Sequence, residues 1–297
     1  MTIGYNDSDA VTDLVENLNN LDYVADPAIA TSLHLAQVLE RPLLIEGRAG
    51  VGKTQIAATM SELLDTELIR LQCYEGLDVN AALYEWNYPK QLLWIRMNES
   101  GNLSPNEMET EIFGRQFLLE RPLLAALTKE KAPVLLIDEV DRADEEFEAF
   151  LLEILSEFQV TIPELGTIKA SNKPLVILTS NRTRDLSDAL RRRCLYLWVD
   201  YPELQKELQI VRKKVAGVSE QLARQVCEFV QATRTEGLGR NPGVSETLDW
   251  TTAMVALHMD YLDPEVVTQT VGTLIKDDDD LNNFKKTTIE RIIQSIG

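Results

Sequence analysis

A run of eight residues combines three glycines with a lysine and a threonine, and it reads Gly47-Arg48-Ala49-Gly50-Val51-Gly52-Lys53-Thr54. Glycines let a loop turn tightly enough for successive backbone N–H groups to converge on phosphate oxygens, and the positive end of a following helix strengthens that attraction. Lys53 is placed to reach the β and γ phosphates of a nucleoside triphosphate, and the Thr54 hydroxyl to ligate Mg²⁺. The whole run is therefore predicted to be a phosphate-binding loop.

Two adjacent carboxylates, Asp138 and Glu139, follow the apolar run Val134-Leu135-Leu136-Ile137. If that run is a strand beside the loop, Asp138 at its tip can hold a Mg²⁺-bound water. Glu139 can then polarise the water that attacks the γ-phosphate. A kinase must exclude water and gains nothing from such a base, so the pair favours hydrolysis. We expect the loop and the acidic pair to lie at adjacent strand tips of one sheet.

Elements able to position these groups are indicated up to about residue 200, where short apolar runs alternate with helical spacing. The runs are Pro42 to Ile45, Leu68 to Leu71, Val134 to Ile137, Leu175 to Leu178 and Leu195 to Val199. Each is too short for a helix and is apolar on both faces, as in parallel strands covered by helices on both sides. Helices are indicated after Asp26-Pro27, after Lys53 and from Phe147 to Phe158. The alternation predicts an α/β fold with a doubly wound parallel sheet of five strands.

The strand signal ends at Tyr201-Pro202, and only helical spacing follows. Apolar stripes run through Leu204 to Val215 and Leu222 to Phe229, and a further helix starts at Asp263-Pro264. We therefore expect a smaller all-α domain that follows the sheet domain in the chain. The predicted organisation is a lead-in at 1–22, a nucleotide-binding core at 23–202 and a helical lid domain at 203–297.

The composition limits the classes of function. Of the 297 residues, 44% are hydrophobic and 26% are charged, which excludes a disordered or fibrous chain. The formal net charge of −19 disfavours a nucleic-acid binder, because an acidic surface repels the phosphate backbone. The two histidines and three cysteines have no metal-ligand spacing, which argues against a zinc site and against a histidine-based catalytic triad.

No segment of the sequence suggests export or insertion into a membrane. Residues 1–7 lack the basic and apolar regions of a signal peptide, and no stretch approaches the ~18 uninterrupted apolar residues of a membrane span. We therefore expect a cytoplasmic protein whose thiols are reduced.

Taken together, these features resemble a family of P-loop NTPases, the AAA+ ATPases. The resemblance rests on a Walker A motif at Gly47 to Thr54, a Walker B motif at Val134 to Glu139, a later apolar strand that leads to Asn181, and a helical C-terminal domain. Within AAA+ the chain looks most like the MoxR group, which includes ATPases that mature carbon monoxide dehydrogenase and other metalloenzymes. The segments that suggest this group are Gln72 to Asp78, Tyr84 to Tyr88 and Gln91 to Leu93.

The resemblance implies an ATP-hydrolysing, Mg²⁺-dependent chaperone or remodelling ATPase. It would act on a protein client in metalloenzyme maturation or complex assembly, and its usual partner carries a von Willebrand factor A domain. It also implies a homo-oligomeric ring, which in AAA+ proteins is usually a hexamer. Asn181 matches sensor 1, whose amide holds the attacking water, whereas the alternative is a turn or helix cap.

The stretch Asp188 to Arg193 resembles the arginine-finger segment of the family. Arg192 or Arg193 would then contact the γ-phosphate bound by a neighbouring subunit. The alternative is a solvated basic cluster that pairs with local acids. Arg142 is a further candidate for such a contact. The usual sensor 2 arginine is missing from Gly243 to Trp250, and Arg240 lies close upstream.

Two further segments carry expectations. Val160 to Ala170 is predicted to form two short strands around a turn, and by resemblance it is the pre-sensor hairpin. Leu77 to Trp94 falls where the MoxR group carries an insert. Its aromatic side chains either face a partner protein or pack against the insert's own helices; they are Tyr84, Trp86 and Tyr88.

Two other classes of function stay open. A nucleic-acid-directed AAA+ motor would need a basic channel, which a local stripe of basic residues could supply despite the net charge. A nucleotide-switched binding module would bind ATP with little turnover, and the presence of Glu139 argues against it.

Overall fold

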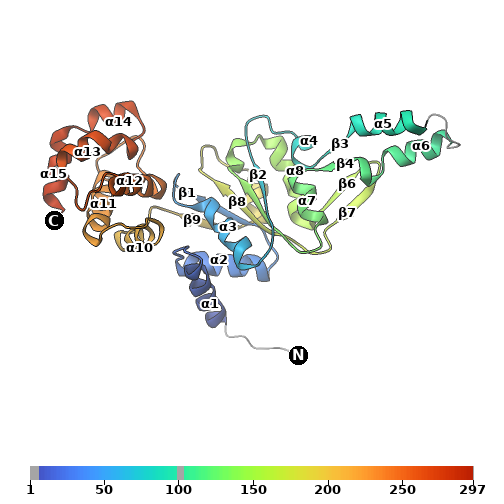
Figure 1. The fold of residues 1–297 in the computed structure, drawn as a ribbon. Coiled ribbons are helices and arrows are strands. Elements are labelled where there is room, and N and C mark those ends of the chain that lie inside the picture. The colour runs from blue at the N-terminus through green and yellow to red at the C-terminus, as the bar shows by residue number, and fades with distance from the viewer. Residues whose placement is uncertain (1–6, 99–103, 297) are drawn as a thin grey trace. The chain divides into compact units, whose positions relative to one another are not determined.

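The computed structural model describes residues 7–98 and 104–296 (Figure 1). The chain divides into two compact units. The sheet unit consists chiefly of Pro27–Glu46 and Ala57–Leu197, and the helical unit consists of Thr12–Asp26, Gly47–Ile56 and Trp198–Gly297. The predicted phosphate-binding loop therefore belongs to the helical unit, although it follows the first strand of the sheet.

A five-stranded sheet organises the sheet unit, with the strand order β2-β5-β8-β1-β9. The strands are β1 (Leu43–Gly47), β2 (Leu68–Gln72), β5 (Val134–Asp138), β8 (Leu175–Ser180) and β9 (Leu195–Val199). β2 pairs with β5, β5 with β8 and β8 with β1, all in parallel. The predicted five-stranded parallel sheet is confirmed. The expected adjacency of the loop's strand and the acidic pair's strand was wrong, because β8 lies between β1 and β5.

Burial differs between the central and the outer strands. β1, β5 and β8 are buried at every position. β2 alternates instead, with Ile69 and Leu71 buried and Arg70 and Gln72 exposed, and Tyr196 on β9 is 51% exposed. The expectation that all five runs are apolar on both faces was therefore wrong for β2 and β9. These strands lie at the edges of the sheet, where helices cover one face less completely.

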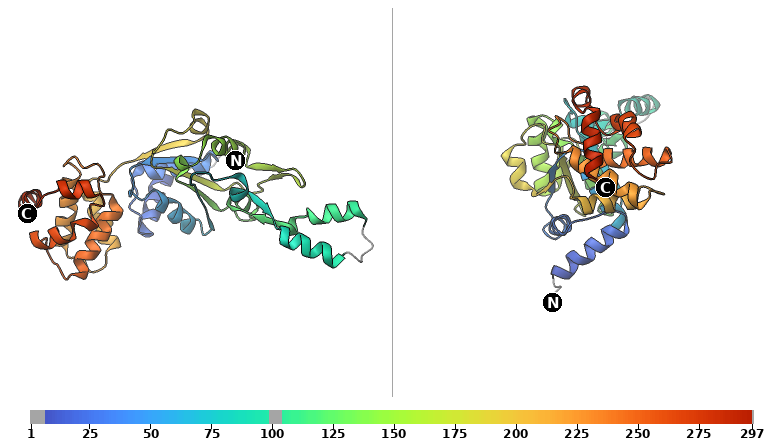
Figure 2. Two further views of the ribbon diagram at one scale, coloured as in Figure 1. Left: turned by 90° about the horizontal axis from the view of Figure 1, so that it is seen from above. Right: turned by 90° about the vertical axis from the view of Figure 1, so that its left-hand side faces the viewer.

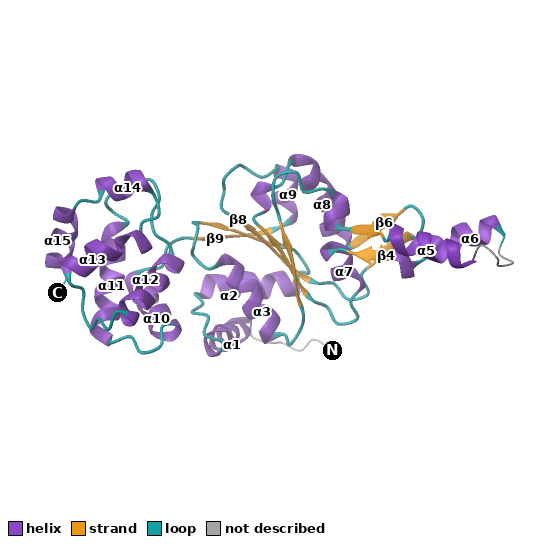
Figure 3. Ribbon diagram, turned by 45° about the horizontal axis from the view of Figure 1, so that its top comes forward, coloured by secondary structure: helices purple, strands orange, loops and turns teal. Residues whose placement is uncertain are grey.

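Helices lie on both faces of the sheet, with α2 and α3 on one face and α8 and α9 on the other (Figure 3). The bounds of these four helices are α2 (Pro27–Val38), α3 (Lys53–Leu63), α8 (Glu145–Glu157) and α9 (Asp188–Arg193). The sheet unit also contains α7 (Pro122–Thr128) and two 3-10 turns, η1 (Arg115–Phe117) before α7 and η2 (Val140–Arg142) after β5. α8 begins where the Asp144 carboxylate accepts a hydrogen bond from the Phe147 amide. It ends at Phe158, whose φ of 51° stops the helix. Leu151 and Ile154 of α8 are buried in the core of the sheet unit.

An insert between β2 and β5 adds a small antiparallel sheet and a pair of neighbouring helices (Figure 2). Its elements are α4 (Val79–Ala82), β3 (Tyr84–Trp86), α5 (Tyr88–Asn98), α6 (Pro105–Ile112) and β4 (Leu118–Glu120). Trp86 is 7% exposed, and its ring stands edge-on to Phe113 with centroids 5.3 Å apart. Tyr88 is 60% exposed. Of the two alternatives for these aromatics, packing within the insert holds for Trp86, whereas Tyr88 faces solvent.

A second antiparallel pair, β6 (Gln159–Ile162) and β7 (Gly166–Lys169), forms the hairpin predicted at Val160 to Ala170. The hydroxyls of Thr161 and Thr167 are 3.1 Å apart across the pair. Gly166 closes the turn with a φ of 76°, which glycine adopts without strain.

The helical unit has its own core and contains the helices that follow β9. They are α10 (Leu204–Lys214), α11 (Glu220–Thr233), α12 (Val244–Ala256), α13 (Pro264–Thr270), α14 (Asp278–Asn283) and α15 (Lys286–Ser295), with a 3-10 turn η3 (Val271–Thr273). Ser219 and Asp263 cap the first turns of α11 and α13 through their side-chain oxygens. Phe229 and Trp250 are fully buried, with ring centroids 5.1 Å apart. The predicted all-α C-terminal domain is confirmed.

The remaining helix, α1 (Asp7–Asn20), lies within the expected lead-in, of which residues 1–6 fall outside the described residues. The boundaries expected at 22/23 and 202/203 stay predictions. Within 7–98 and 104–296 no helix is both long enough and apolar enough to cross a membrane.

Candidate functional site

The predicted phosphate-binding loop starts at the last residue of β1 and leads into α3. Gly50 and Gly52 have φ angles of 71° and 89°, a backbone conformation that residues with a Cβ rarely adopt. Gly47 runs so close to β9 that a Cβ there would lie 1.9 Å from the carbonyl oxygen of Val199. The path of the backbone therefore requires glycine at each of these positions.

Lys53 is the first residue of α3 and is 7% exposed. Its Nζ donates to the carbonyl oxygens of Gly47 at 3.0 Å and Arg48 at 2.7 Å, so the ammonium group lies across the loop. Charged phosphate oxygens accept stronger hydrogen bonds than these neutral carbonyls do. Thr54 is the next residue of the helix and is exposed, and the Arg48 guanidinium lies 3.8 Å from the Asp200 carboxylate.

Helix α12 contacts the loop at Gly50. The Ser245 amide donates to the Gly50 carbonyl at 3.1 Å, and a Cβ on Gly50 would lie 2.6 Å from Ser245 Oγ. The Glu246 carboxylate caps the first turn of α12. The segment that lacks a sensor 2 arginine thus reaches the loop through its backbone. Arg240 has an exposed side chain, and its backbone amide donates to Asp280 at 2.9 Å.

In the sheet unit, Asp138 ends β5 and is 2% exposed. Its Oδ1 accepts a hydrogen bond from Thr179 Oγ1, and its Oδ2 accepts one from Arg70 Nη2, both at 2.5 Å. A buried carboxylate needs such partners, because an unpaired charge in the interior is costly. The ion pair with Arg70 shows that a cation can lie beside Oδ2 of Asp138.

Glu139 has a left-handed backbone, with φ 54° and ψ 49°, and its amide donates to Thr179 Oγ1 at 2.9 Å. Its Oε2 accepts from Gln72 Nε2 at 3.2 Å and pairs with Arg142 Nε at 2.9 Å. Its Oε1 lies 3.5 Å from Asn181 Nδ2. The structure therefore brings the predicted base and the predicted sensor amide together. Arg142 forms an ion pair within its own chain.

The loop that follows β8 is organised by Asp141, which lies in η2 and is 3% exposed. Its Oδ1 accepts a hydrogen bond from the backbone amide of Asn181 at 3.2 Å. Its Oδ2 accepts from the amide and the hydroxyl of Thr183 at 2.8 and 2.7 Å. One carboxylate thus holds the backbone on both sides of residue 182.

The three arginines of α9 have different surroundings. Arg191 donates to both oxygens of the fully buried Glu46, at 3.0 and 3.2 Å. Arg193 donates to Ser156 Oγ at 2.7 Å and to a carbonyl of its own helix at 3.2 Å. The Arg192 side chain is exposed, and its guanidinium forms no hydrogen bond or ion pair with any residue of 7–98 or 104–296.

The thiol of Cys73 lies directly after β2, and its backbone amide donates to the Asp138 carbonyl at 2.9 Å. Burial raises the pKa of this thiol to about 12, and the carboxylates of Asp138, Asp141 and Glu139 add to the effect. The thiolate is the reactive form of cysteine, so Cys73 is not a nucleophile near neutral pH.

Four residues of this cluster were missed by sequence reasoning: Arg70, Gln72, Asp141 and Thr179. The polar side chains of β2 alternate with apolar ones, which is a usable signal for a strand with one polar face. Thr179 is two residues before Asn181, so an extended chain there would place both side chains on the same side. Asp141 carries no signal of its own, because it lies in a stretch rich in acidic residues, 138–148.

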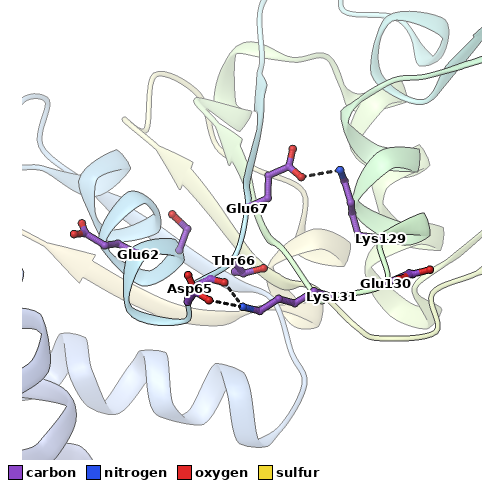
Figure 4. A pocket seen from close by; sticks show the side chains of 8 residues that line it. Glu62, Asp65, Thr66, Glu67, Lys129, Glu130 and Lys131 are labelled. Atoms are coloured by element: carbon purple, nitrogen blue, oxygen red, sulfur yellow. Dashed lines mark hydrogen bonds and ion pairs between the residues drawn. The ribbon is translucent and has the colours of Figure 1, made fainter.

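A separate pocket of about 600 Å³ opens near the amino-terminal ends of β2 and β5, whereas the predicted acidic pair follows the carboxyl-terminal end of β5 (Figure 4). Its lining residues are Ser61, Glu62, Asp65, Thr66, Glu67, Lys129, Glu130 and Lys131. Lys129 pairs with Glu67 at 2.7 Å and Lys131 with Asp65 at 3.1 Å, and all four side chains are exposed to solvent. None of the predicted site residues lines this pocket.

The chain is similar to uncharacterized proteins of two staphylococci. A Staphylococcus aureus protein is 27% identical over 203 residues, which cover 66% of this chain and 70% of the relative. A Staphylococcus epidermidis protein is 26% identical over 203 residues, with the same shares of 66% and 70%.

Two solved structures are similar to this one over most of its length. One is a candidate ATPase from Cytophaga hutchinsonii, with a TM-score of 0.46, 18% identity, and coverage of 98% of this chain and 94% of that one. The other is the Thermotoga maritima RuvB Holliday junction branch migration motor, with a TM-score of 0.48, 18% identity, and coverage of 94% and 76%.

The family described as the AAA domain, dynein-related subfamily, matches residues 42–194. The match begins one residue before β1 and ends one residue after α9, so it includes the glycine-rich loop, the acidic pair, Asn181 and the three arginines. It spans more than half of the 297 residues. The chain therefore belongs to the AAA domain family, in its dynein-related subfamily.

Proposed function

We propose that this AAA chain is an ATPase that hydrolyses ATP to ADP and phosphate, with Glu139 as the general base. The observation that carries the proposal is the 3.5 Å approach of Asn181 Nδ2 to Glu139 Oε1, at the ends of the neighbouring strands β8 and β5. An amide that donates and a carboxylate that accepts can bind the same water molecule and orient it for attack.

The loop at 47–54 is the proposed triphosphate site, with Lys53 on the β and γ phosphates. The left-handed backbone at Gly50 and Gly52 supports this, because it lets successive N–H groups turn toward one anion. The ammonium group of Lys53 supports it too, since within the loop it donates to neutral carbonyls that a phosphate oxygen can replace.

Thr54 and Asp138 are the proposed ligands of Mg²⁺. Hydroxyl and carboxylate oxygens are the hard ligands that this ion prefers. Asp138 fits a cation, because Oδ2 already accepts a hydrogen bond from the Arg70 guanidinium. Bound Mg²⁺ would neutralise charge on the phosphates.

In the proposed reaction a water oxygen bonds to the γ-phosphorus while the bond to the bridging oxygen of ADP breaks, and a water proton passes to Glu139. The Glu139 carboxylate is oriented for this by polar neighbours on both oxygens. Gln72 and Arg142 hold Oε2, which leaves Oε1 on the side of the Asn181 amide.

Arg192 is the proposed arginine finger. Its side chain is exposed and lacks a partner within the described part of the chain, whereas Arg193 is tied to Ser156. A finger that completes a neighbour's site requires assembly, so we propose a homo-oligomeric ring, with six subunits as the expected number. A single subunit would then hydrolyse ATP slowly.

The proposed work of this ATPase is MoxR-type remodelling of a protein client in the cytoplasm, in metalloenzyme maturation or complex assembly. A partner with a von Willebrand factor A domain is part of the proposal. The net charge of −19 supports a protein client over a nucleic acid. The exposed α5 side chains Leu92 (61%) and Met97 (75%) support it too, because they offer apolar surface for a protein contact.

The test compares the wild-type chain with Lys53→Ala and Glu139→Gln in two assays, ATP binding and phosphate release. We expect Lys53→Ala to lose binding and Glu139→Gln to bind without turnover. Binding without release by the wild type would favour a nucleotide-switched module, and stimulation of release by DNA would favour a nucleic-acid motor. A wild-type chain that neither binds ATP nor releases phosphate would reject the proposal. Proteins retained by Glu139→Gln with ATP, but not by Lys53→Ala, identify the client.

A further inference from the structure

We propose that Asp141 is a positioning residue for hydrolysis, because it binds the backbone of the segment whose Asn181 side-chain amide lies against Glu139. The inference rests on the proposed function, in which Asn181 and Glu139 orient the attacking water. Asp141 itself is 3% exposed, and its carboxylate oxygens bind backbone and hydroxyl donors. It would therefore act on the reaction through Asn181.

The first support is that the two carboxylate oxygens of Asp141 bind different residues. Oδ1 accepts from the backbone amide of Asn181 at 3.2 Å, and Oδ2 accepts from the backbone amide and the hydroxyl of Thr183 at 2.8 and 2.7 Å. Hydrogen bonds to an ionised acceptor are stronger than bonds between neutral groups. A carboxylate is also the only side chain of this size with acceptor capacity on both ends and no donor, so asparagine cannot reproduce all three bonds.

The second support is the backbone between these two residues. Arg182 has a φ of 61°, a strained left-handed conformation that residues with a Cβ rarely adopt. Such a conformation persists only where the surroundings hold it. The Asp141 carboxylate holds the residue before it and the residue after it, so the loop cannot relax to an ordinary conformation and move Asn181.

The third support is a reciprocal arrangement of the two strand ends. The Thr179 hydroxyl on β8 accepts from the backbone amide of Glu139 at 2.9 Å. The Asp141 carboxylate, three residues after β5, accepts from the backbone amide of Asn181. Each strand end is thus anchored by a side chain from the other. These anchors fix the two backbones from which the Asn181 amide and the Glu139 carboxylate approach each other. A misplacement of about 1 Å in a catalytic group can cost a large factor in rate.

The decisive experiment is a double-mutant cycle of Asp141→Asn and Asn181→Ala, read in ATP hydrolysis by the full-length chain. We expect Asp141→Asn to lower kcat about tenfold and to leave KM within about twofold, because the loss affects orientation rather than binding. In the Asn181→Ala background the same change is expected to have no further effect on kcat. A second loss of about tenfold in that background would overturn the proposal, since Asp141 would then act independently of Asn181.

Thr183→Val is the matched control. It removes the hydrogen bond from the Thr183 hydroxyl to Asp141 and keeps the bond from the Asn181 backbone amide to Asp141. We therefore expect kcat to stay within about twofold of the wild type. A kcat loss as large as that of Asp141→Asn would show that Asp141 serves only to stabilise the loop, and would overturn the proposal.

A measurement on the wild-type chain keeps the proposal testable if Asp141→Asn does not fold. Amide hydrogen exchange at Asn181 and Thr183 is expected to be at least about tenfold slower than in an unstructured peptide, because both amides are held by one carboxylate. Exchange at the unstructured rate would overturn the proposal. If the wild type releases no phosphate, the proposed function fails and this role of Asp141 fails with it. If the wild type hydrolyses ATP and the cycle is additive, only the role of Asp141 fails.

Discussion

The backbone amide of Ser245 donates a hydrogen bond of 3.1 Å to the carbonyl oxygen of Gly50. Ser245 lies in the first turn of α12 and Gly50 lies in the glycine-rich loop, so the all-α domain is joined directly to residues proposed to hold phosphate. The resemblance to AAA+ proteins implies a sensor 2 arginine near the start of such a helix, and the first turn of α12 lacks one. We infer that movement of the loop on nucleotide binding would be transmitted to α12 through the backbone.

Replacement of Gly50 tests this contact. In Gly50→Ala the new Cβ would lie 2.6 Å from Ser245 Oγ and 2.9 Å from Glu246 Oε2, at a φ of +71°. We expect ATP affinity to fall about tenfold and the thermal unfolding midpoint of the all-α domain to fall as well. Gly52→Ala is the control, because its Cβ meets nothing within 4 Å and only backbone strain remains. Equal changes in the unfolding midpoint for the two variants would contradict a role for α12.

The two exposed arginines of α9 are expected to separate into a catalytic and a structural residue. Arg192→Ala should lower the ATPase rate of the assembled protein about 10³-fold without a change in thermal stability. Arg193→Ala should lower stability by about 1 kcal/mol, because it loses the 2.7 Å bond to Ser156, and should leave more of the rate. Mixing Arg192→Ala subunits with Lys53→Ala subunits provides the readout. Partial recovery of activity is expected, since one variant supplies the site and the other the finger. No recovery would argue against a finger supplied by a neighbour.

The ion pair of Arg234 and Glu207 should dominate the stability of the helical unit. The pair measures 2.7 Å, with side-chain exposures of 7% and 0%. Removing the cation in Arg234→Ala leaves a buried carboxylate without its counter-ion, so we expect unfolding in urea to need about 3–5 kcal/mol less free energy. Arg212→Ala is the control, since its pair with Glu220 is 43% and 62% exposed and is expected to contribute under about 1 kcal/mol. Similar losses for the two variants would contradict the assignment.

The three cysteines are expected to be unreactive in the folded protein. Burial raises the pKa of each thiol from 9.0 to about 12. Folding therefore favours the protonated thiol, and the stability contributed by this difference is complete below pH 9 and is lost as pH rises toward 12. Ellman's reagent at pH 8 should label no thiol of the native chain and all of them in denaturant. Between pH 9 and 11 the unfolding free energy of Cys194→Ala should fall less steeply than that of the wild type; an identical slope would contradict the burial of Cys194.

The glycine-rich loop and the acidic pair could be predicted because each is contiguous in the sequence and its chemistry resides in the residue types. The partners of Asp138 could not. Arg70 and Thr179 reach it only because β5 lies between β2 and β8, and the order of strands in a sheet does not follow the order of strands in the chain.

The arginines of α9 show a second limit. Arg191, Arg192 and Arg193 are chemically identical and adjacent, so the sequence cannot rank them. They differ because successive residues of a helix point in different directions, which takes Arg191 to Glu46 and Arg193 to Ser156. The sequence likewise could not predict the burial of Trp86, since this depends on the pairing of β3 with β4, in which Trp86 lies opposite Leu118.

The central claim is that Glu139 is the base of an ATPase, and phosphate release by the full-length assembled chain tests it most directly. Glu139→Gln keeps the shape of the side chain and removes its basicity. With Mg²⁺ and saturating ATP, we expect this variant to bind nucleotide within about threefold of wild-type affinity and to release phosphate at least about 100-fold more slowly. Release at the wild-type rate would show that Glu139 is not the base and would contradict the account.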